Sequence, residues 1–463
     1  MFRNLILVSV FSFLSVNAFS QKCNCETEVK SIAGFMEKNY AGFKDKQAIM
    51  TKAGYDKMLK QYLALAKGPH ADEHCLMIIS QYLQQFKDHH VSVRANFDAT
   101  KLDSAYLAQR EIIPLSDKKI AELRKSHGIE GVYDFHDPAK YKIAVMKDKT
   151  PLRDYVAVII SSNLPGWKPG MIKWEGKMIN DTVARGVLYV LNGMPKAEGF
   201  YFKGDRIYGD WHREGTTVEN PASSKYEPVA FKKLSPKTAY LKVSTFDSSN
   251  GKNIDSIINA NKASLNDMPN LVIDLRGNGG GADWTFAPLM NLVYTGPVKH
   301  IGNDLLSTDT NIEGWKVFLT DEDRSEENKQ GIRTIIKNLE ANKGKMVTNT
   351  KDFDITGYTA IASPKKVVIL IDKGCASSTE EFLLEARQSK KVILMGENTS
   401  GTLDYSNVLT APFPCMPYTI GYSSSRSRRI DVGQGIDNVG IKPAKYLQEK
   451  DDWIEKAKAE LEN

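Results

Sequence analysis

A serine follows a buried strand at a position where its hydroxyl could act as a nucleophile. The run Val367–Ile371 is apolar and β-branched, which is typical of a strand buried on both faces of a parallel sheet. The residues from Glu381 to Glu385 favour a helix. Ser377 therefore lies at or just before a helix N-terminus, where free backbone N–H groups can stabilise an oxyanion. In the alternative interpretation, Ser377, Ser378 and Thr379 only cap the helix.

A second predicted strand runs into a glycine-rich turn. Asn270–Leu275 is apolar apart from Asn270 and Asp274, and Arg276–Gly281 follows it directly. Glycine lets the backbone adopt positive φ and approach a ligand closely. The turn has neither the Gly-x-Gly-x-x-Gly order nor the Gly-Lys-Ser/Thr ending of the common phosphate-binding loops.

Taken together, these segments resemble the tail-specific, or C-terminal-processing, serine protease family. That family carries an Asp-Leu-Arg-x-Asn-x-Gly-Gly turn, then Ser-x-Ser/Thr-Glu after a strand, then a Gly-Glu-x-Thr-x-Gly loop. The same motifs occur here in the same order, at Asp274–Gly281, Ser377–Glu380 and Gly396–Gly401. The resemblance covers about residues 236–445. It implies a ClpP/crotonase-like α/β protease core, Ser377 as the nucleophile, a peptide or protein substrate, and no metal or cofactor.

The general base is implied by one branch of that family. Many members use a lysine about 25 residues after the serine, but that position here is Thr402. The tricorn-core-like branch instead uses an Asp-x-His motif after amino-terminal helices, which corresponds to Asp88-His89-His90. This resemblance makes His90 the base, and an imidazole titrating near pH 6.5 suits that role. The alternative is an ordinary pair of surface histidines.

The resemblance also suggests an acid and an oxyanion hole. The branch carries an acidic residue in a motif that matches Asp437–Pro443, so Asp437 would orient His90, with Asp404 as the second choice. An Asx turn would explain Asp437 equally well. The oxyanion hole would combine the N–H of Ser378 with that of Gly280, or secondarily with that of Gly279.

Three competing functions stay open at this point. The stretch His70–His74 matches His-x-x-Glu-His and could hold zinc, although Pro69 places His70 at the start of its helix and no third ligand is evident. Cys375 could be a thiol nucleophile. The chain could also be a non-catalytic peptide- or ligand-binding protein on the same fold.

Composition and the first residues indicate which partners and which cellular compartment to expect. The chain has 463 residues and a net charge of +6, which is too small for its length to indicate a nucleic-acid partner. Residues 1–20 have a basic start, an apolar stretch and a small-residue end, which predicts a cleaved signal peptide and an exported, periplasmic or extracellular protein without stable membrane insertion. Five irregularly spaced cysteines argue against a disulfide framework.

The hydrophobic patterns predict three domains after the signal peptide. Helical spacing predominates within 21–127, which ends in the histidine-bearing strand. Residues 128–235 alternate as short strands with turns between them, as in a barrel or sandwich, and lack a clear PDZ signature. Strands and helices alternate over 236–463, which we expect to form the α/β protease core.

Overall fold

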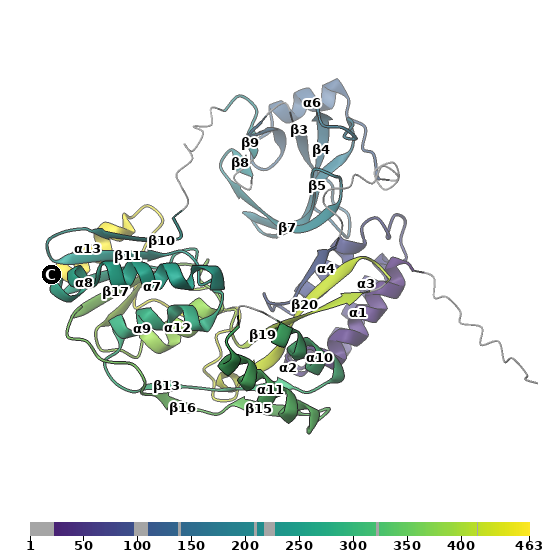
Figure 1. Cartoon of the computed structure of the whole chain (residues 1–463). Coiled ribbons are helices and arrows are strands. Elements are labelled where there is room, and N and C mark those ends of the chain that lie inside the picture. The colour runs from purple at the N-terminus through teal and green to yellow at the C-terminus, as the bar shows by residue number, and fades with distance from the viewer. Residues whose placement is uncertain are drawn as a thin grey trace, which may run out of the picture.

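The computed structural model describes residues 23–96, 110–137, 140–207, 211–216, 227–320, 324–413 and 415–463. The predicted signal peptide at 1–20 lies outside these residues. Helices, a barrel and three sheets, one of them only two-stranded, make up the described chain (Figure 1). No helix in these ranges is both long and apolar enough to cross a membrane.

A six-stranded sheet forms the α/β core. Its strand order is β10-β11-β12-β17-β18-β21, and all neighbours are parallel except β10 and β11. Its strands are β10 (Val229–Lys233), β11 (Thr238–Val243), β12 (Asn270–Asp274), β17 (Lys366–Ile371), β18 (Val392–Gly396) and β21 (Lys445–Tyr446). The apolar runs that predicted β12 and β17 are buried because helices cover both faces of the sheet.

The two faces of this sheet pack against different helices. One face shares an apolar core with α7 (Gly251–Ala260), α8 (Lys262–Asp267), α9 (Ala287–Val293) and α12 (Ser378–Ala386). The other face packs against α13 (Trp453–Glu462) at the end of the chain. Since β17 leads directly into α12, the sheet places the N-terminus of α12 at its carboxyl edge.

A second sheet brings together strands that are far apart in the sequence. It has the order β1-β20-β14-β15, with β19 also pairing with β20. Its strands are β1 (Ser92–Ala95), β14 (Asn303–Leu306), β15 (Met346–Thr350), β19 (Tyr405–Phe413) and β20 (Tyr418–Ser427). In β1, Ser92 lies opposite Gly421 of β20. Residues from the amino-terminal and carboxyl-terminal parts of the chain therefore share one sheet.

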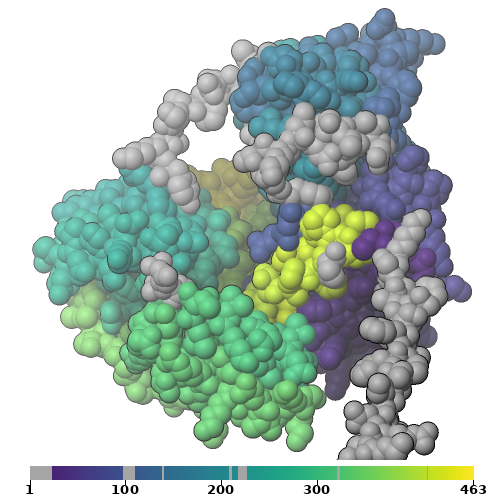
Figure 2. All heavy atoms as spheres, turned by 45° about the vertical axis from the view of Figure 1, so that its right-hand side comes forward, coloured from purple at the N-terminus to yellow at the C-terminus, as the bar shows by residue number. Residues whose placement is uncertain are grey.

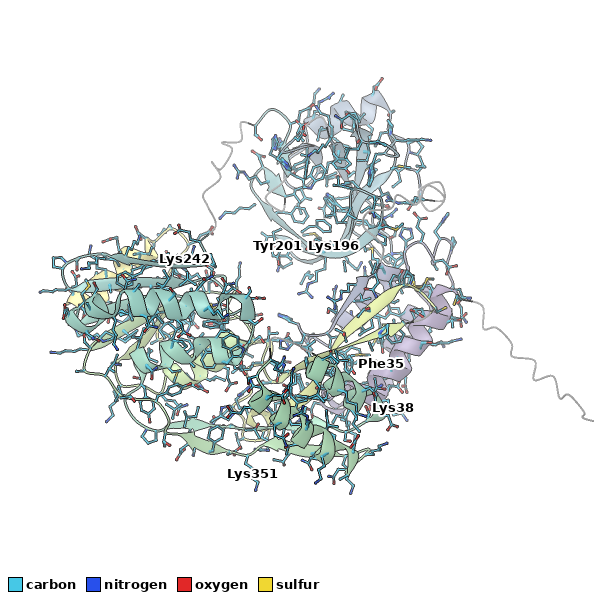
Figure 3. The ribbon with its side chains drawn as sticks, in the orientation of Figure 1. Phe35, Lys38, Lys196, Tyr201, Lys242 and Lys351 are labelled. Carbon is cyan, nitrogen blue, oxygen red and sulfur yellow. A yellow bond between two sulfur atoms is a disulfide. The ribbon has the colours of Figure 1, made fainter. Side chains whose placement is uncertain are left out.

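The amino-terminal helices pack against this second sheet. They are α1 (Cys25–Asn39), α2 (Phe43–Met50), α3 (Lys52–Leu65) and α4 (Cys75–Gln84). Phe35 of α1 makes edge-to-face contacts with Phe413 and Tyr422, with ring centroids 5.3 and 4.9 Å apart (Figure 3). Figure 2 shows the same neighbourhood as a yellow carboxyl-terminal segment lying against the purple amino-terminal one.

A closed barrel separates these amino-terminal elements from the α/β core in sequence. It consists of β2 (Gly131–Phe135), β3 (Lys142–Lys147), β4 (Tyr155–Ser161), β5 (Ile172–Asn180), β6 (Val183–Tyr189), β7 (Pro195–Lys203), β8 (Arg206–Ile207) and β9 (Trp211–Arg213). Helix α6 (Asp117–Arg124) packs on β2 and β3 through Leu123. The α/β core, the amino-terminal helices and a β-rich region are thus present as expected, whereas the domain boundaries stay a prediction.

Shorter elements complete the described chain. They are β13 (Val298–His300), which pairs with β16 (Phe353–Ile355), the helices α10 (Asp309–Val317) and α11 (Glu326–Glu340), and the 3-10 turns Ser248–Asn250, Asp283–Phe286, Phe318–Thr320 and Arg428–Ile430. A disulfide links Cys25 of α1 to Cys75 of α4. The irregular cysteine spacing gave no indication of this bond, because its partners are brought together by helix packing.

Candidate active site

Ser377 lies in a tight turn between β17 and α12. Its backbone has φ +55° and ψ −123°, a conformation that residues with a Cβ rarely adopt. The turn is held from both sides: the Ala376 N–H donates to the carbonyl of Asn278, and the Ser378 hydroxyl donates to the carbonyl of Gly281 at 2.9 Å. The glycine-rich turn therefore holds the backbone on both sides of Ser377, at the N-terminus of α12.

Cys375 is close to Ser377 in sequence but is poorly suited to act as a nucleophile. Its side chain is fully buried, and its Sγ donates to the carbonyl of Leu275 at 3.0 Å. Burial raises the pKa of this thiol well above its ordinary value, which disfavours the reactive thiolate.

The glycine turn lies directly against the serine turn. Gly280 has φ +95°, and a Cβ at this position would lie 2.9 Å from Ser377 Cβ and 2.9 Å from Ser378 N. The Asn278 side chain organises the turn, because its Nδ2 donates to Val243 at 3.1 Å and its Oδ1 accepts the Gly280 N–H at 3.0 Å. The close approach to Ser377 thus requires glycine at position 280.

The donors predicted for the oxyanion hole differ in their availability. The Ser378 N–H is in the first turn of α12, where an N–H has no intrahelical acceptor. The Gly280 N–H is already engaged by Asn278. Over the described residues, the Gly279 N–H makes no hydrogen bond within the protein. The structure thus brings all three groups near Ser377, and it leaves Gly279 rather than Gly280 with a free N–H.

His90 reaches Ser377 from the opposite end of the sequence. Its Nε2 lies 3.2 Å from Ser377 Oγ, and its Nδ1 lies 2.7 Å from the backbone carbonyl of Tyr405. Because a carbonyl can only accept, this contact assigns the proton to Nδ1 and leaves Nε2 free to accept from the serine hydroxyl. His90 lies in the turn just before β1, close to its expected place on a strand.

Asp88 fixes the backbone turn that carries His90. Its Oδ1 accepts the His90 N–H at 2.9 Å, while its Oδ2 accepts from the hydroxyls of Tyr40 at 2.8 Å and Ser423 at 3.1 Å. These partners come from α1's C-terminal end and from β20. The carboxylate of the Asp-x-His motif therefore positions the histidine through its backbone and does not contact the imidazole ring.

Asp437, the acid that we expected to orient His90, contacts other groups instead. Asp437 forms an ion pair with Lys46 and accepts from Asn438 Nδ2 at 2.9 Å, and no hydrogen bond joins Asp437 to His90 in the described chain. Burial raises the pKa of Asp437 to about 6, although the Lys46 ammonium opposes this shift. The geometry assigns Asp437 to holding α2 near the site and leaves Tyr405's carbonyl as the group that orients His90.

Asp404, the second choice for the acid, also has other partners. Its Oδ2 accepts the N–H groups of Ile436 at 2.5 Å and Asp437 at 2.8 Å, and its Oδ1 lies 3.3 Å from Arg429 Nε. It thus caps the loop that carries Asp437. Every residue type has a backbone carbonyl, so no sequence motif could have identified Tyr405 as the partner of His90.

Glu380 is a buried residue whose role the motif alone did not reveal. Its carboxylate accepts from Thr399 Oγ1 at 2.5 Å and from the N–H groups of Gly401 and Thr402, both at 2.7 Å. It also accepts the Ser377 N–H at 3.3 Å. Burial raises the pKa of Glu380, and these hydrogen bonds counteract the shift. Glu380 therefore joins the Gly396–Gly401 loop to the serine turn.

The side chain of His89 contacts the segment around Ser400 and not the catalytic-serine candidate Ser377. Its Nδ1 is 3.0 Å from Ser400 Oγ and 3.2 Å from Thr402 Oγ1. Burial lowers the pKa of His89, with nearby cations adding to the effect. The structure thus separates the two adjacent histidines, and His90 is the one beside Ser377.

The His-x-x-Glu-His stretch is not arranged to hold zinc. His74 places its ring nitrogens 3.0 Å from Glu175 and 3.5 Å from Glu111. Although burial favours the neutral ring, these carboxylates raise the pKa of His74 to about 10, so it serves as a cation. His70 is exposed and has φ +58°, which takes it off the helical geometry that the motif needs.

A group of three side chains that could hold a metal ion lies beside α12, beyond the serine. His300, Glu381 and Glu385 offer ligand atoms that all lie within 4.8 Å of one another. The nearby carboxylates of Glu381 and Glu385 raise the pKa of His300 to about 9, against the effect of burial.

We compared the chain with known protein families and solved structures. The model of peptidase family S41 matches residues 237–446. Two structures of CPAF, one in complex with lactacystin and one of a mutant, each align with a TM-score of 0.50 and 13% sequence identity. Each alignment covers 95% of this chain, and it covers 97% of the lactacystin complex and 96% of the mutant. A peptidase structure from Parabacteroides merdae aligns with a TM-score of 0.44 and 14% identity, over 94% of this chain and 93% of its own. No curated protein sequence matches significantly.

Proposed function

Because residues 237–446 belong to peptidase family S41, we propose that this protein is an exported serine endopeptidase in which His90 activates Ser377. The observation that carries the proposal is the 3.2 Å contact between His90 Nε2 and Ser377 Oγ. A serine hydroxyl needs an adjacent base to attack a carbonyl, and no lysine occupies the position where much of the family has one.

The contacts support a two-step acyl transfer. His90 Nε2 removes the hydroxyl proton while Ser377 Oγ bonds to the peptide carbonyl carbon, giving a tetrahedral oxyanion. The imidazolium then gives that proton to the departing amine as the C–N bond breaks, which leaves an acyl-enzyme. Water, deprotonated by the same Nε2, hydrolyses the ester and restores the serine. The Ser378 N–H and a glycine N–H from the facing turn stabilise the oxyanion.

The Tyr405 carbonyl takes the orienting role in this scheme. Its 2.7 Å hydrogen bond fixes the His90 tautomer, and its dipole favours the imidazolium that forms during attack. A carbonyl carries no full charge, so it stabilises the imidazolium less than a carboxylate would. Asp437 contributes indirectly, through the Lys46 ion pair that lies beside the Tyr405 ring, whose centroid is 4.8 Å from Lys46 Nζ.

The disulfide supports the export part of the proposal. Bonds such as that between Cys25 and Cys75 form and persist in oxidising compartments outside the cytosol. Together with the signal-peptide pattern of residues 1–20, this favours a periplasmic or extracellular enzyme that acts on peptides or proteins. The scheme uses only side chains and backbone groups of the chain and involves no cofactor.

The test is labelling of the purified chain with a fluorophosphonate probe. We expect the wild type to label, Ser377→Ala to lose labelling, and His90→Gln to label about 10²–10⁴-fold more slowly, which is the usual contribution of a general base. His89→Gln is the matched control, because His89 contacts Ser400 rather than Ser377, and it should retain most of the rate.

Two outcomes would contradict the proposal. Labelling that survives Ser377→Ala would move the nucleophile elsewhere. A folded wild type that neither labels nor cleaves a denatured protein substrate would favour the alternative, a non-catalytic peptide-binding protein on the same fold.

A further inference from the structure

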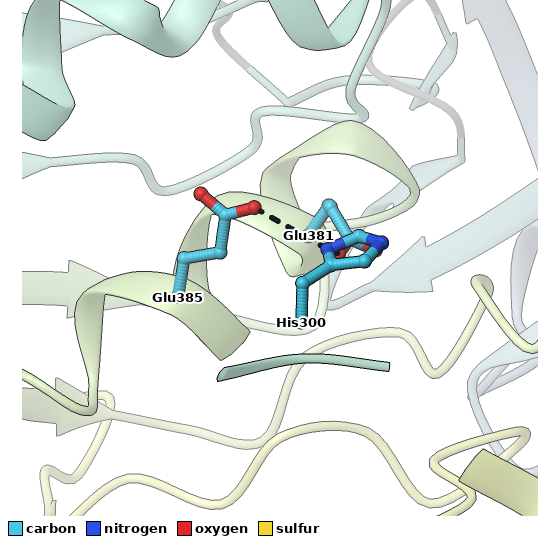
Figure 4. Close-up of side chains that lie close together, drawn as sticks. All are labelled: His300, Glu381 and Glu385. Atoms are coloured by element: carbon cyan, nitrogen blue, oxygen red, sulfur yellow. Dashed lines mark ion pairs between the residues drawn. The ribbon is translucent and has the colours of Figure 1, made fainter. Parts of the chain in front are cut away.

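A histidine and two glutamates converge on the side of α12, one turn beyond the serine. Glu381 and Glu385 are four residues apart and therefore share a helix face, while His300 comes from the end of β13 (Figure 4). His300 Nδ1 lies 3.2 Å from Glu381 Oε1 and 3.7 Å from Glu385 Oε1. None of these side chains takes part in the proposed peptide hydrolysis.

Glu385 is the least satisfied member of this cluster. Its residue is 6% exposed, and its Oε2 is buried without a hydrogen-bond partner. Its only described partner is the His300 ring at 3.7 Å, which is beyond hydrogen-bonding distance. A carboxylate removed from water is costly unless a cation or donors compensate it, so this oxygen lacks the partner that its burial requires.

We propose that His300, Glu381 and Glu385 bind one divalent first-row transition-metal ion. A single imidazole and two carboxylates form a ligand set that suits Zn²⁺ and its neighbours better than Ca²⁺ or Mg²⁺. Metal–ligand bonds of about 2.0–2.2 Å in a tetrahedral site put neighbouring ligand atoms about 3.4 Å apart. The two separations from His300, 3.2 and 3.7 Å, are close to this value, and all three ligand atoms lie within 4.8 Å of one another.

A small cavity adjoins the His300 and Glu381 side of the cluster, and Glu385 does not line it. A cavity of about 30 Å³ is lined by His300 and Glu381 together with Asn303, Ser406 and Arg429. This volume is enough for roughly two or three water molecules, at about 10–15 Å³ each. An open coordination position could therefore be filled by solvent.

Arg429 contacts Glu381 through a different oxygen from the one offered to the metal. Arg429 Nη1 lies 3.5 Å from Glu381 Oε2, whereas His300 faces Glu381 Oε1. Arg429 also pairs with Asp404, which takes up part of its charge. The guanidinium thus acts as an outer partner that orients the Glu381 carboxylate toward the metal.

A metal here would connect β13 to the helix that begins at Ser377. Glu381 is in the first turns of α12, and β13 already meets this helix through Val298, which shares an apolar core with Phe382. Just past the helix, Gln388 Oε1 also accepts the Lys299 N–H of β13 at 2.9 Å. The ion would stabilise the folded state by binding it in preference to the unfolded chain. This inference does not depend on whether Ser377 is catalytic.

The test uses the full chain, freed of metal with a chelator and then titrated with Zn²⁺ against a fluorescent indicator. We expect one Zn²⁺ per chain and a rise in the thermal unfolding midpoint. His300→Gln and Glu385→Gln should each weaken binding at least tenfold and abolish the Zn²⁺-dependent rise. His70→Gln is the control, because it removes an exposed histidine from the other candidate zinc motif.

The readouts separate a real site from adventitious binding. Equal Zn²⁺ affinity in the wild type and in folded His300→Gln and Glu385→Gln chains would overturn the proposal, as would a wild type that binds no Zn²⁺. Loss of binding in His70→Gln alone would assign the ion to the His70 segment instead. Circular dichroism of each variant shows whether it is folded, and Glu385→Gln keeps the test decisive if His300→Gln unfolds.

Discussion

Replacing Gly280 with alanine tests whether the glycine turn positions the serine. The new Cβ would lie 2.6 Å from the Ala376 carbonyl oxygen and 2.9 Å from Ser377 Cβ, and backbone atoms cannot swing away from it. Alanine at φ +95° adds about 1–2 kcal/mol of backbone strain, and overpacking adds about 1–3 kcal/mol. The folded state should therefore lose roughly 2–5 kcal/mol, which a domain of ordinary stability can tolerate.

The effect on chemistry should be similar in size to the effect on stability, since a 10²-fold loss in rate corresponds to about 2.7 kcal/mol. The clash is relieved only if the turn at Ser377 moves, and a displacement of about 1 Å at a reacting group can cost on the order of 10²-fold in rate. We expect Gly280→Ala to label with the fluorophosphonate probe about 10²-fold more slowly at a temperature where urea titration shows it to be folded.

Gly279→Ala is the matched control for this prediction. A Cβ at position 279 meets nothing within 4 Å, its φ is not positive, and the substitution keeps the N–H. It should label at nearly the wild-type rate. A wild-type labelling rate for Gly280→Ala would refute the reasoning, because the serine turn would then tolerate the displacement; equal slowing of both variants would refute it as well.

Two further predictions concern buried charged groups. Because the pKa of His74 is raised from 6.5 to about 10 in the folded chain, its stabilising contribution is complete below pH 6.5 and is lost as the pH rises toward 10. Urea unfolding should show His74→Gln less stable than the wild type by roughly 2–4 kcal/mol at pH 6, a gap that narrows by pH 10; a gap independent of pH would contradict this. Glu380→Gln should slow probe labelling at least tenfold, because the amide N–H₂ would replace one of the two oxygens and face either the Gly401 N–H or the Thr402 N–H; Glu397→Gln, outside this network, should not. Unchanged labelling of a folded Glu380→Gln chain would show that the loop does not position the serine.

The parts of the site that could be predicted are those encoded by short continuous segments. The buried strand before Ser377 and the glycine turn at Gly280 each combine an apolar run with residues that a tight turn requires, so local sequence was sufficient. His90 could be proposed only through the family resemblance. Its contact with Ser377 spans 287 residues, and no local pattern encodes such a distance.

What could not be predicted depends on backbone atoms or on tertiary packing. The partner of His90 is the Tyr405 carbonyl, which any residue type would supply, so the search for an acid led to Asp437. The His300 cluster depends on the pairing of β13 with β16, whose strands are only three residues long and lack a clear alternation. Short strands of this kind are recognised by their neighbours and not by their own residues.

The pairing of β1 with β20 has a consequence for how the protein is made. His90 is synthesised well before β20, the strand that holds its turn through Gly421 opposite Ser92 and through the Ser423 hydroxyl. A chain truncated before β20 would carry both the serine and the histidine without the sheet that brings them together. Because long-range strand pairing forms late and requires both partners, a chain that lacks β20 should be inactive, and hydrolytic activity should begin only once β20 has been made and has paired with β1.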